Sequence, residues 1–462
     1  MNARILRIEL RRSIAPWAAL AAVVVALGFL FAFSGPWTRF PLDWGSHWVL
    51  AAEWSRFLLV FLWPIAVGAG VIQGMRDSRS GMVELLTTMP RPGWHRAAKL
   101  AGALAGLLVL GYLLVFAVGA VQVLFNGGFF TFGWLPIVVV GALGMIAGAW
   151  IGLGVGRLLP HPLTAPVLAV VSFVGMIVLQ LAQSEGSVLA GELPLPSWVV
   201  LLSPAFDVFN DPFLTTSSRM DLGQAVWLIG LAATGLLFLA AGSRRAKALA
   251  AVPLVAALAI AVPILPATPA EAKVVDPLAT AMVCDGPVCV TKMHEAELGK
   301  IAGPGKEALR LLGTLPDAPV KIVEFDRRLG YEEVPPRAAD TLIVDLMSLP
   351  LYLATDPDDV TRALVAGAGT PSCASSRGSG ASYLDDVTAR TISASWFLGE
   401  WKPLKGGNIW ASQETTGQID RTWGTFRALP PDVQRTRIVA QRQAGLTCQG
   451  DQLEILTGGL AR

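Results

Sequence analysis

Seven apolar segments, each close to the length of a membrane span, dominate the first 265 residues of this chain. A helix needs about 20 apolar residues to cross the hydrocarbon core of a bilayer. The chain is 53% hydrophobic and 15% charged, with a mean hydropathy of +0.55, which is too apolar for an ordinary soluble protein. We therefore expect an α-helical polytopic membrane bundle of about seven spans, at roughly residues 16–34, 57–74, 98–125, 134–156, 163–183, 224–241 and 248–265.

The first apolar run has some features of a secretory signal peptide. Arg4, Arg7, Arg11 and Arg12 precede it, and it ends near the small residues of "AFSG". Its length and the six runs that follow favour an uncleaved anchor instead.

The positions of Lys and Arg next to the spans predict the orientation, because basic loops stay in the cytoplasm. With the N-terminus inside, only Arg39, Arg56 and Arg219 of the basic residues before Pro266 fall outside. An odd number of spans then places everything after Pro266 on the extracytoplasmic side. The basic residues placed inside are Arg4, Arg7, Arg11, Arg12, Arg76, Arg79, Arg91, Arg96, Lys99, Arg157, Arg244, Arg245 and Lys247.

The cysteines agree with this topology, because disulfides persist in oxidising compartments. All of them lie in the segment placed outside: Cys284, Cys289, Cys373 and Cys448. We expect two disulfides, and the sequence leaves three connectivities open. The alternative is a zinc site, but "CDGPVC" has loose spacing and no paired motif nearby, so we expect no metal site.

Small residues mark close contacts between helices in lipid. The fourth span carries Gly144, Gly148, Gly152 and Gly156 on one face, and Gly102 and Gly106 repeat the spacing in the third. This glycine seam indicates either a dimer or sliding interface or packing inside one bundle. Between the fifth and sixth spans, the short apolar run 198–202 predicts a re-entrant or surface-lying helix, with a covered loop as the alternative.

The apolar centres of the spans contain no Asp, Glu, Lys, Arg or His. Ion-coupled transporters usually need such groups at membrane depth. If the bundle moves a substrate uphill, the energy is therefore expected to come from another subunit.

A polar stretch, "GMRDSRSGMVELLTTMPRPGWHRAAKL", separates the second and third spans. Within it, Met82, Leu85, Leu86 and Met89 form one apolar stripe at helical spacing. Ser80 can cap the start of this helix, and Pro90 ends it. The sequence predicts a short amphipathic helix near residues 80–90, flanked by basic residues, with an apolar face that another surface must cover.

The segment "GMVELLTTMPRPGWHRAAKLAG" resembles the Gly-x-x-Glu-Leu-Leu-x-x-x-Pro segment of permease subunits in ABC-2-type ATP-binding-cassette exporters. The likeness covers roughly residues 1–245. In that family the segment is the coupling helix that docks on the ATPase. The resemblance gives this role to Gly81, Glu84, Leu85, Leu86 and Pro90, and the apolar stripe adds Met82 and Met89.

The resemblance implies a permease subunit that is not an enzyme. ATP and magnesium would bind a separate cytoplasmic ATPase subunit, and this chain would hold no cofactor. A second permease subunit, identical or different, would complete the pathway; lipid is the other expected partner and nucleic acid is not. The Ala-, Gly-, Arg- and Pro-rich composition favours a bacterial plasma membrane. The chain departs from the family in "RDSRS", where Asp77 is the only acid, and in its seventh span and added domain.

Residues 1–265 are thus expected to form a transmembrane permease domain and residues 266–462 an extracytoplasmic α/β domain. "KIVEFD" and "TLIVDL" predict buried strands, and "TAMVCDGPVCVTK" predicts a hairpin turning at Asp285–Gly286. Helices are expected near 294–314, 357–368, 383–401, 414–428 and 431–444, with Pro304 breaking the first.

The added domain carries no complete catalytic motif. "HEAEL" has Leu298 where a zinc peptidase needs its second histidine, so His294 is expected to be a lone surface histidine. A carboxylate pair could still form, and the candidates for it are Asp385, Asp386, Glu324, Asp326, Glu332 and Glu333. The alternative function is therefore a polytopic anchor for an extracytoplasmic binding or hydrolytic domain.

Overall fold

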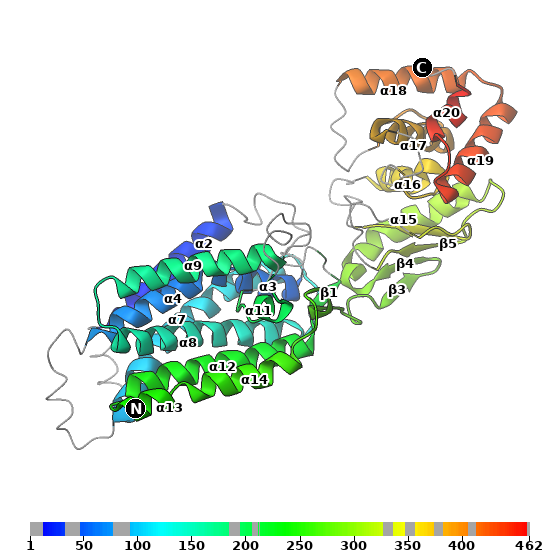
Figure 1. Ribbon diagram of the computed structural model, residues 1–462. Coiled ribbons are helices and arrows are strands. Elements are labelled where there is room, and N and C mark those ends of the chain that lie inside the picture. The colour runs from blue at the N-terminus through cyan, green and yellow to red at the C-terminus, as the bar shows by residue number, and fades with distance from the viewer. Residues whose placement is uncertain are drawn as a thin grey trace. The chain divides into compact units, whose positions relative to one another are not determined.

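The computed structural model describes residues 13–32, 47–76, 93–183, 195–205, 211, 213–326, 336–346, 356–373, 382–404 and 413–459. The chain divides into two compact units, Met1–Asp276 and Pro277–Arg462 (Figure 1). The sequence boundary was expected after Leu265. The later division has a physical cause, because a strand just before Asp276 pairs with a strand that precedes the sixth candidate span.

The first unit is a bundle of long apolar helices. Six of them are long and apolar enough to cross a membrane, and a seventh candidate is a pair of helices, α3 and α4, bent by 46°. These match the seven apolar runs of the sequence, so the prediction of a helical membrane bundle is confirmed at this level. The helices are α2 (Ala15–Ala32), α3 (Trp48–Phe57), α4 (Leu59–Gly74), α7 (Gly93–Phe125), α8 (Trp134–Leu158), α9 (Thr164–Gln183), α12 (Ser218–Ala240), α13 (Arg244–Leu249) and α14 (Val252–Ile264).

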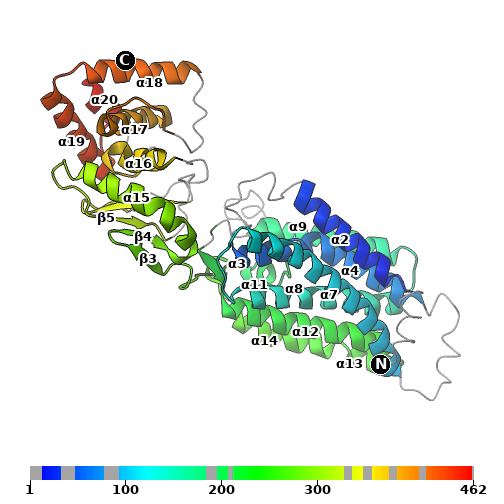
Figure 2. The ribbon, with the colours of Figure 1, turned by 180° about the vertical axis from the view of Figure 1, so that it is seen from behind.

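Helix α8 lies at the centre of the bundle and packs against α3, α4, α7 and α12. Helix α14 packs on α12, α9 on α4, and α2 on α7 and α4, as the two opposite views show (Figures 1 and 2). Two tryptophans add polar contacts between neighbouring helices. Trp63 Nε1 donates to Gly144 O at 2.9 Å, and Trp150 Nε1 donates to Ala101 O at 3.0 Å.

The glycine seam lies between α8 and α4, inside the chain. A Cβ atom built on Gly152 would lie 2.3 Å from Val67 O, and one on Gly156 would lie 2.3 Å from Val71 O. Gly148 faces the Trp63 indole, and Gly144 faces Leu59 and Pro204. The absence of side chains thus lets the two backbones touch, which is how small residues stabilise helix pairs in lipid.

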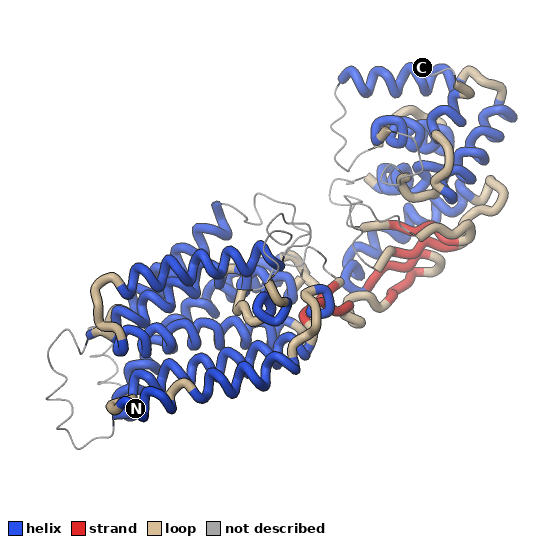
Figure 3. Tube along the Cα trace, viewed as in Figure 1, coloured by secondary structure: helices blue, strands red, loops and turns tan. Residues whose placement is uncertain are grey.

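A short helix and a two-stranded ribbon complete the first unit. Helix α11 (Ser197–Leu201) falls at the apolar run 198–202, where a short helix was expected. Strands β1 (Leu214–Thr216) and β2 (Lys273–Val275) pair antiparallel, with Thr215 opposite Val274. Figure 3 shows the β1–β2 ribbon in red.

The second unit is built on a mixed sheet of order β3-β4-β5-β6. Strands β4 (Val288–Thr291), β5 (Lys321–Glu324) and β6 (Thr341–Val344) run parallel, and β3 (Met282–Asp285) pairs antiparallel with β4. The predicted strands and hairpin are confirmed. Gly286, with a φ of +63°, and Pro287 form the turn. The α-helices of this unit are α15 (Glu295–Leu312), α16 (Pro357–Val365), α17 (Tyr383–Leu398), α18 (Gln413–Arg427), α19 (Pro431–Thr447) and α20 (Gln452–Thr457).

Pro304 does not break the first helix, contrary to the sequence prediction. It lies within α15, which runs continuously from Glu295 to Leu312. A proline removes the hydrogen bond to the carbonyl four residues earlier, and that residue, Lys300, is exposed. Water can therefore bind the freed carbonyl. The buried face of α15, with Ile301 and Ala308, packs in the core and outweighs the loss.

Both disulfides are formed. Cys284 pairs with Cys289 across the hairpin, and Cys373 pairs with Cys448. The first connectivity follows from the strand register, which places the two cysteines directly opposite each other. The second joins the chain after α16 to the end of α19 and closes a much longer loop, which constrains the unfolded chain more strongly.

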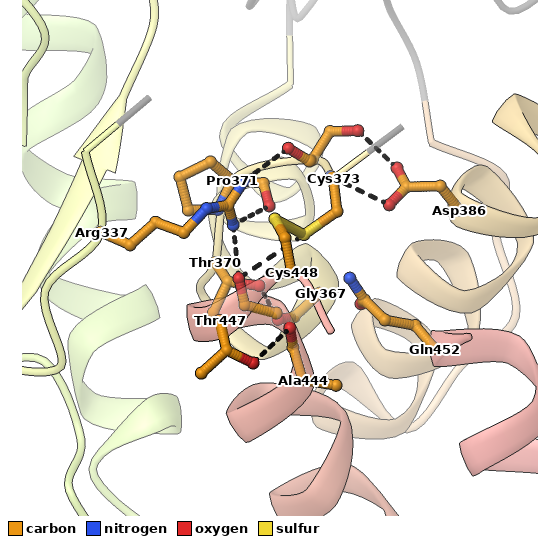
Figure 4. Close-up of a disulfide and its surroundings, with 12 residues drawn as sticks. Arg337, Gly367, Thr370, Pro371, Cys373, Asp386, Ala444, Thr447, Cys448 and Gln452 are labelled. Atoms are coloured by element: carbon orange, nitrogen blue, oxygen red, sulfur yellow. Dashed lines mark hydrogen bonds between the residues drawn. A yellow bond between two sulfur atoms is a disulfide. The ribbon is translucent and has the colours of Figure 1, made fainter. Parts of the chain in front are cut away.

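Around Cys373–Cys448, charged side chains bind loop backbone rather than one another (Figure 4). Arg337 donates to the carbonyl oxygens of Pro371 and Gly445, and to Ser372 O at 2.7 Å. Asp386 accepts from Ser372 Oγ at 2.6 Å and from the Cys373 amide at 3.3 Å. Burial, with the nearby charge of Arg390, lowers the pKa of Arg337 to about 10.

Candidate functional site

Helix α11 ends in a turn that three side chains from three different helices hold in place. Gln224 of α12 donates to Leu201 O at 2.7 Å and to Ser203 O at 2.9 Å. Arg56 of α3 donates through Nε to Pro204 O at 3.1 Å. Gln183 of α9 donates to Val200 O and Ala205 O at 3.4 and 3.5 Å. We call Arg56, Gln183 and Gln224 the α11 clamp.

The α11 clamp binds carbonyls at the end of the short helix and in the turn that follows it. The last carbonyls of a helix have no intrahelical partner and must be bound by side chains or water. Here the clamp residues are buried: the exposed fraction is 1% for Arg56, 7% for Gln183 and 0% for Gln224. The position of α11 therefore depends on how α3, α9 and α12 are spaced.

A buried ion pair supports the clamp. Arg56 NH1 lies 3.5 Å from Asp221 Oδ1 in the first turn of α12, and Thr216 Oγ1 donates to Asp221 Oδ2 at 2.9 Å. Glu53, one turn before Arg56 on α3, is also buried, and its charge and the Tyr112 hydroxyl lie within electrostatic reach of Arg56. Removing one partner of such a pair leaves an uncompensated buried charge, which costs several kcal/mol.

The sequence does not reveal this cluster. It predicts Arg56 on the outer side, before the second span, and the apolar centres of the spans contain no ionisable groups. In the structure, helix α3 precedes the second apolar run, and Glu53 and Arg56 are buried on it, with Arg56 paired to Asp221. Arg56, before the second span, and Asp221, at the start of the sixth, carry opposite charges, and this was the signal that the sequence offered. Nothing in the sequence pairs those two helices.

The residues predicted for the coupling helix, Gly81, Met82, Glu84, Leu85, Leu86, Met89 and Pro90, lie outside the described residues. The described chain on either side of them ends with α4 and resumes with α7. Among the residues that the structure describes, no group of three or more His, Cys, Asp or Glu side chains could hold a metal ion.

His294 is buried, with 6% of its surface exposed, so the expectation of a surface histidine was wrong. Its Nδ1 bonds Glu324 Oε1, while Glu324 Oε2 accepts from the Thr291 amide at 2.6 Å and hydroxyl at 2.8 Å. The Thr291 hydroxyl and the Glu324 carboxylate both contact the Nδ1 atom of the His294 imidazole. These contacts tie the end of β4 and the start of α15 to β5.

The other carboxylate candidates do not meet Glu324 in the described part of the chain. Asp385 caps the start of α17 by accepting from Ser382, and Asp386 binds the Ser372–Cys373 backbone and hydroxyl. Glu332 and Glu333 lie outside the described residues. Asp385 and Asp386 therefore have structural partners of their own, and Asp326, two residues after Glu324, is exposed.

Glu324→Gln should destabilise the second unit by about 1–3 kcal/mol, because an amide cannot accept from all three donors around Glu324. Urea unfolding of the full-length chain, followed by hydrogen exchange at residues 288–291, measures this loss. Glu295→Gln is the matched control, since Glu295 forms an exposed ion pair with Lys292 and such pairs contribute about 0–1 kcal/mol. Equal effects of the two substitutions would contradict a stabilising role for Glu324.

Comparison with protein-family models, with curated proteins and with solved structures found no match to this chain.

Proposed function

We propose that the chain is the membrane permease subunit of an ATP-driven exporter and that it couples to a separate cytoplasmic ATPase. The observation that supports the proposal is the segment Gly81–Pro90, whose sequence resembles a coupling helix and which lies between the second and third candidate spans. ATP and magnesium would bind the ATPase.

The distribution of charge along the bundle supports the proposal. Whereas Arg56 lies near the end of α3 and Arg219 near the start of α12, seven of the described basic residues of the first unit lie at the end of α4, the start of α7, the end of α8 and the start of α13. Figures 1 and 2 show these helix ends together, at the end of the bundle opposite α11. Basic loops favour the cytoplasm. The coupling segment would then face the ATPase, and the second unit would be extracytoplasmic. The seven residues are Arg76, Arg96, Lys99, Arg157, Arg244, Arg245 and Lys247.

Leu85→Asp with Leu86→Asp should abolish copurification of a candidate ATPase subunit with the full-length chain. The substitutions place two charges on the apolar stripe, and a buried charge without a partner costs several kcal/mol. The measurement is the amount of ATPase retained when the chain is purified in mild detergent, together with its stimulated ATP hydrolysis.

Thr87→Asp with Thr88→Asp is the matched control, because both residues lie away from the stripe at helical spacing. The control should retain the ATPase. If every candidate ATPase fails to bind the unaltered chain, or if stripe and control variants retain it equally, the exporter proposal is wrong. The anchor function would then be the better explanation of the bundle.

A further inference from the structure

The β1–β2 ribbon connects the start of the second unit to the first turn of α12. The Asp276 amide, one residue before the second unit begins, donates to Phe213 O at 2.8 Å. At the other end of the ribbon, the Ser217 amide donates to Ala272 O at 2.9 Å, and Ser217 caps α12. The segment that leads to the second unit is therefore paired along its length and is not a free linker.

The ribbon leads directly to the α11 clamp through side-chain bonds. Thr216, the last residue of β1, donates its hydroxyl to Asp221, and Asp221 pairs with Arg56. Arg56 in turn binds Pro204 O, in the turn that follows α11. Each of the three side chains is buried, with exposed fractions of 7%, 7% and 1% respectively.

Apolar packing follows the same route. A small cluster contains Leu201 of α11, Met220 of α12, Leu265 after α14 and Ala272 before β2, all of them buried. Half-buried Leu202 and Leu214 pack against it. The end of α11 and the base of the β1–β2 ribbon thus share one core, so that displacing the ribbon exposes apolar surface beneath α11.

We propose that the β1–β2 ribbon is a built-in mechanical link, through which the segment that leads to the second unit is coupled to the order of α11. The path is ribbon, Thr216, Asp221, Arg56, and then the turn after α11. Thr216 of the ribbon and Arg56 of the α11 clamp both bind Asp221, so loosening the ribbon at Thr216 should weaken the hold of Arg56 on the turn after α11. This inference rests on bonds within the first unit and does not require the exporter function.

Thr216→Val tests the link without disturbing backbone pairing. Loss of the hydroxyl donor should raise deuterium uptake at residues 197–203 of the full-length chain by about fivefold, the change in opening equilibrium expected for one hydrogen bond. Thr215→Val is the matched control, since it is the same substitution on the neighbouring ribbon residue. Equal uptake at α11 in the two variants would overturn the proposal.

Val274→Pro opens the ribbon itself, because proline cannot donate to the strand opposite. Val274 is 40% exposed, so the substitution leaves the core unchanged. Uptake should rise together at residues 213–216, 272–276 and 197–203, whereas Val274→Thr should match the unaltered chain. Higher uptake in the ribbon with unchanged uptake at residues 197–203 would refute the link. If uptake also rises throughout α8, the bundle itself has unfolded, and the test of the link then rests on the Thr216→Val result.

Discussion

Gly152→Leu is expected to prevent the helical bundle from forming its native packing. A Cβ atom at this position would lie 2.3 Å from Val67 O and 3.1 Å from the Val71 amide nitrogen, both of them backbone atoms of α4. Backbone cannot move aside as a flexible side chain can. Helices α4 and α8 would have to separate, and the loss should reach at least about 3 kcal/mol, the upper end of overpacking effects.

Gly106→Leu provides the matched control. Gly102 and Gly106 have the same spacing in α7 as the seam glycines, but a Cβ atom on either would meet nothing within 4 Å. Leucine favours a helix by several tenths of a kcal/mol relative to glycine. The control should therefore be neutral or slightly stabilising.

The two variants can be compared by thermal unfolding of the full-length chain in detergent, with monodispersity on size exclusion as the readout. Gly152→Leu should yield little monodisperse protein or a strongly lowered Tm, and Gly106→Leu should resemble the unaltered chain. If both variants unfold alike, the close contact between α4 and α8 does not stabilise the bundle.

These glycines show what a sequence can and cannot predict about packing. The four-residue spacing identifies both sets, because it places small residues on one helix face. Whether that face meets another helix depends on the tertiary arrangement. Gly152 meets the backbone of α4, whereas Gly106 has open space around it. For the same reason, the sequence does not distinguish a dimer interface from internal packing at the seam.

The spans themselves were predictable, since crossing a bilayer requires length and apolarity and no particular partner. The start of the second span was not. Glu53 and Arg56 make α3 too polar to count as part of an apolar run, yet both are buried, and α12 supplies Asp221 as a partner for Arg56. Buried polar clusters depend on contacts between distant segments, so periodicity does not reveal them.

In the second unit, local signals predicted most elements. Asp356 caps α16, Ser382 and Asp385 form a capping box for α17, and Pro431 opens α19, as such residues commonly do. Local signals failed at Pro304 and His294. Packing of α15 keeps the helix continuous through Pro304. The bond to Glu324, which lies 30 residues away in sequence, holds His294 in a buried position.

Arg442→Met is expected to destabilise the second unit by about 3 kcal/mol or more, because it leaves backbone carbonyls without donors. Arg442 is 1% exposed and holds three segments together. NH1 donates to Ala368 O at 2.7 Å, while NH2 donates to Ala339 O at 2.7 Å and to Asp317 O at 3.1 Å. Burial lowers the pKa of Arg442, and the charge of Asp317 opposes that shift.

Two effects compete in this substitution. Methionine is apolar, so it removes the cost of burying a charge, and replacing a whole buried ion pair by apolar residues can even stabilise a protein. Here the acceptors are main-chain carbonyls, which stay when the guanidinium is removed. The cost of leaving these carbonyls without donors should therefore exceed the gain from removing a buried charge. The backbone around Ala368, and the backbone next to the disulfide Cys373–Cys448, should then unfold locally more often.

Arg435→Met supplies the comparison, because it makes the same change on the same helix at an exposed residue that donates to the carbonyl of Thr314. Exposed substitutions of this kind usually change stability by about 0.5 kcal/mol or less. The free energy of unfolding, from urea titration with hydrogen exchange at residues 366–373, should fall for Arg442→Met and barely change for Arg435→Met. A similar, small change in both would mean that water or other donors replace the guanidinium, and that Arg442 does not hold the three segments together.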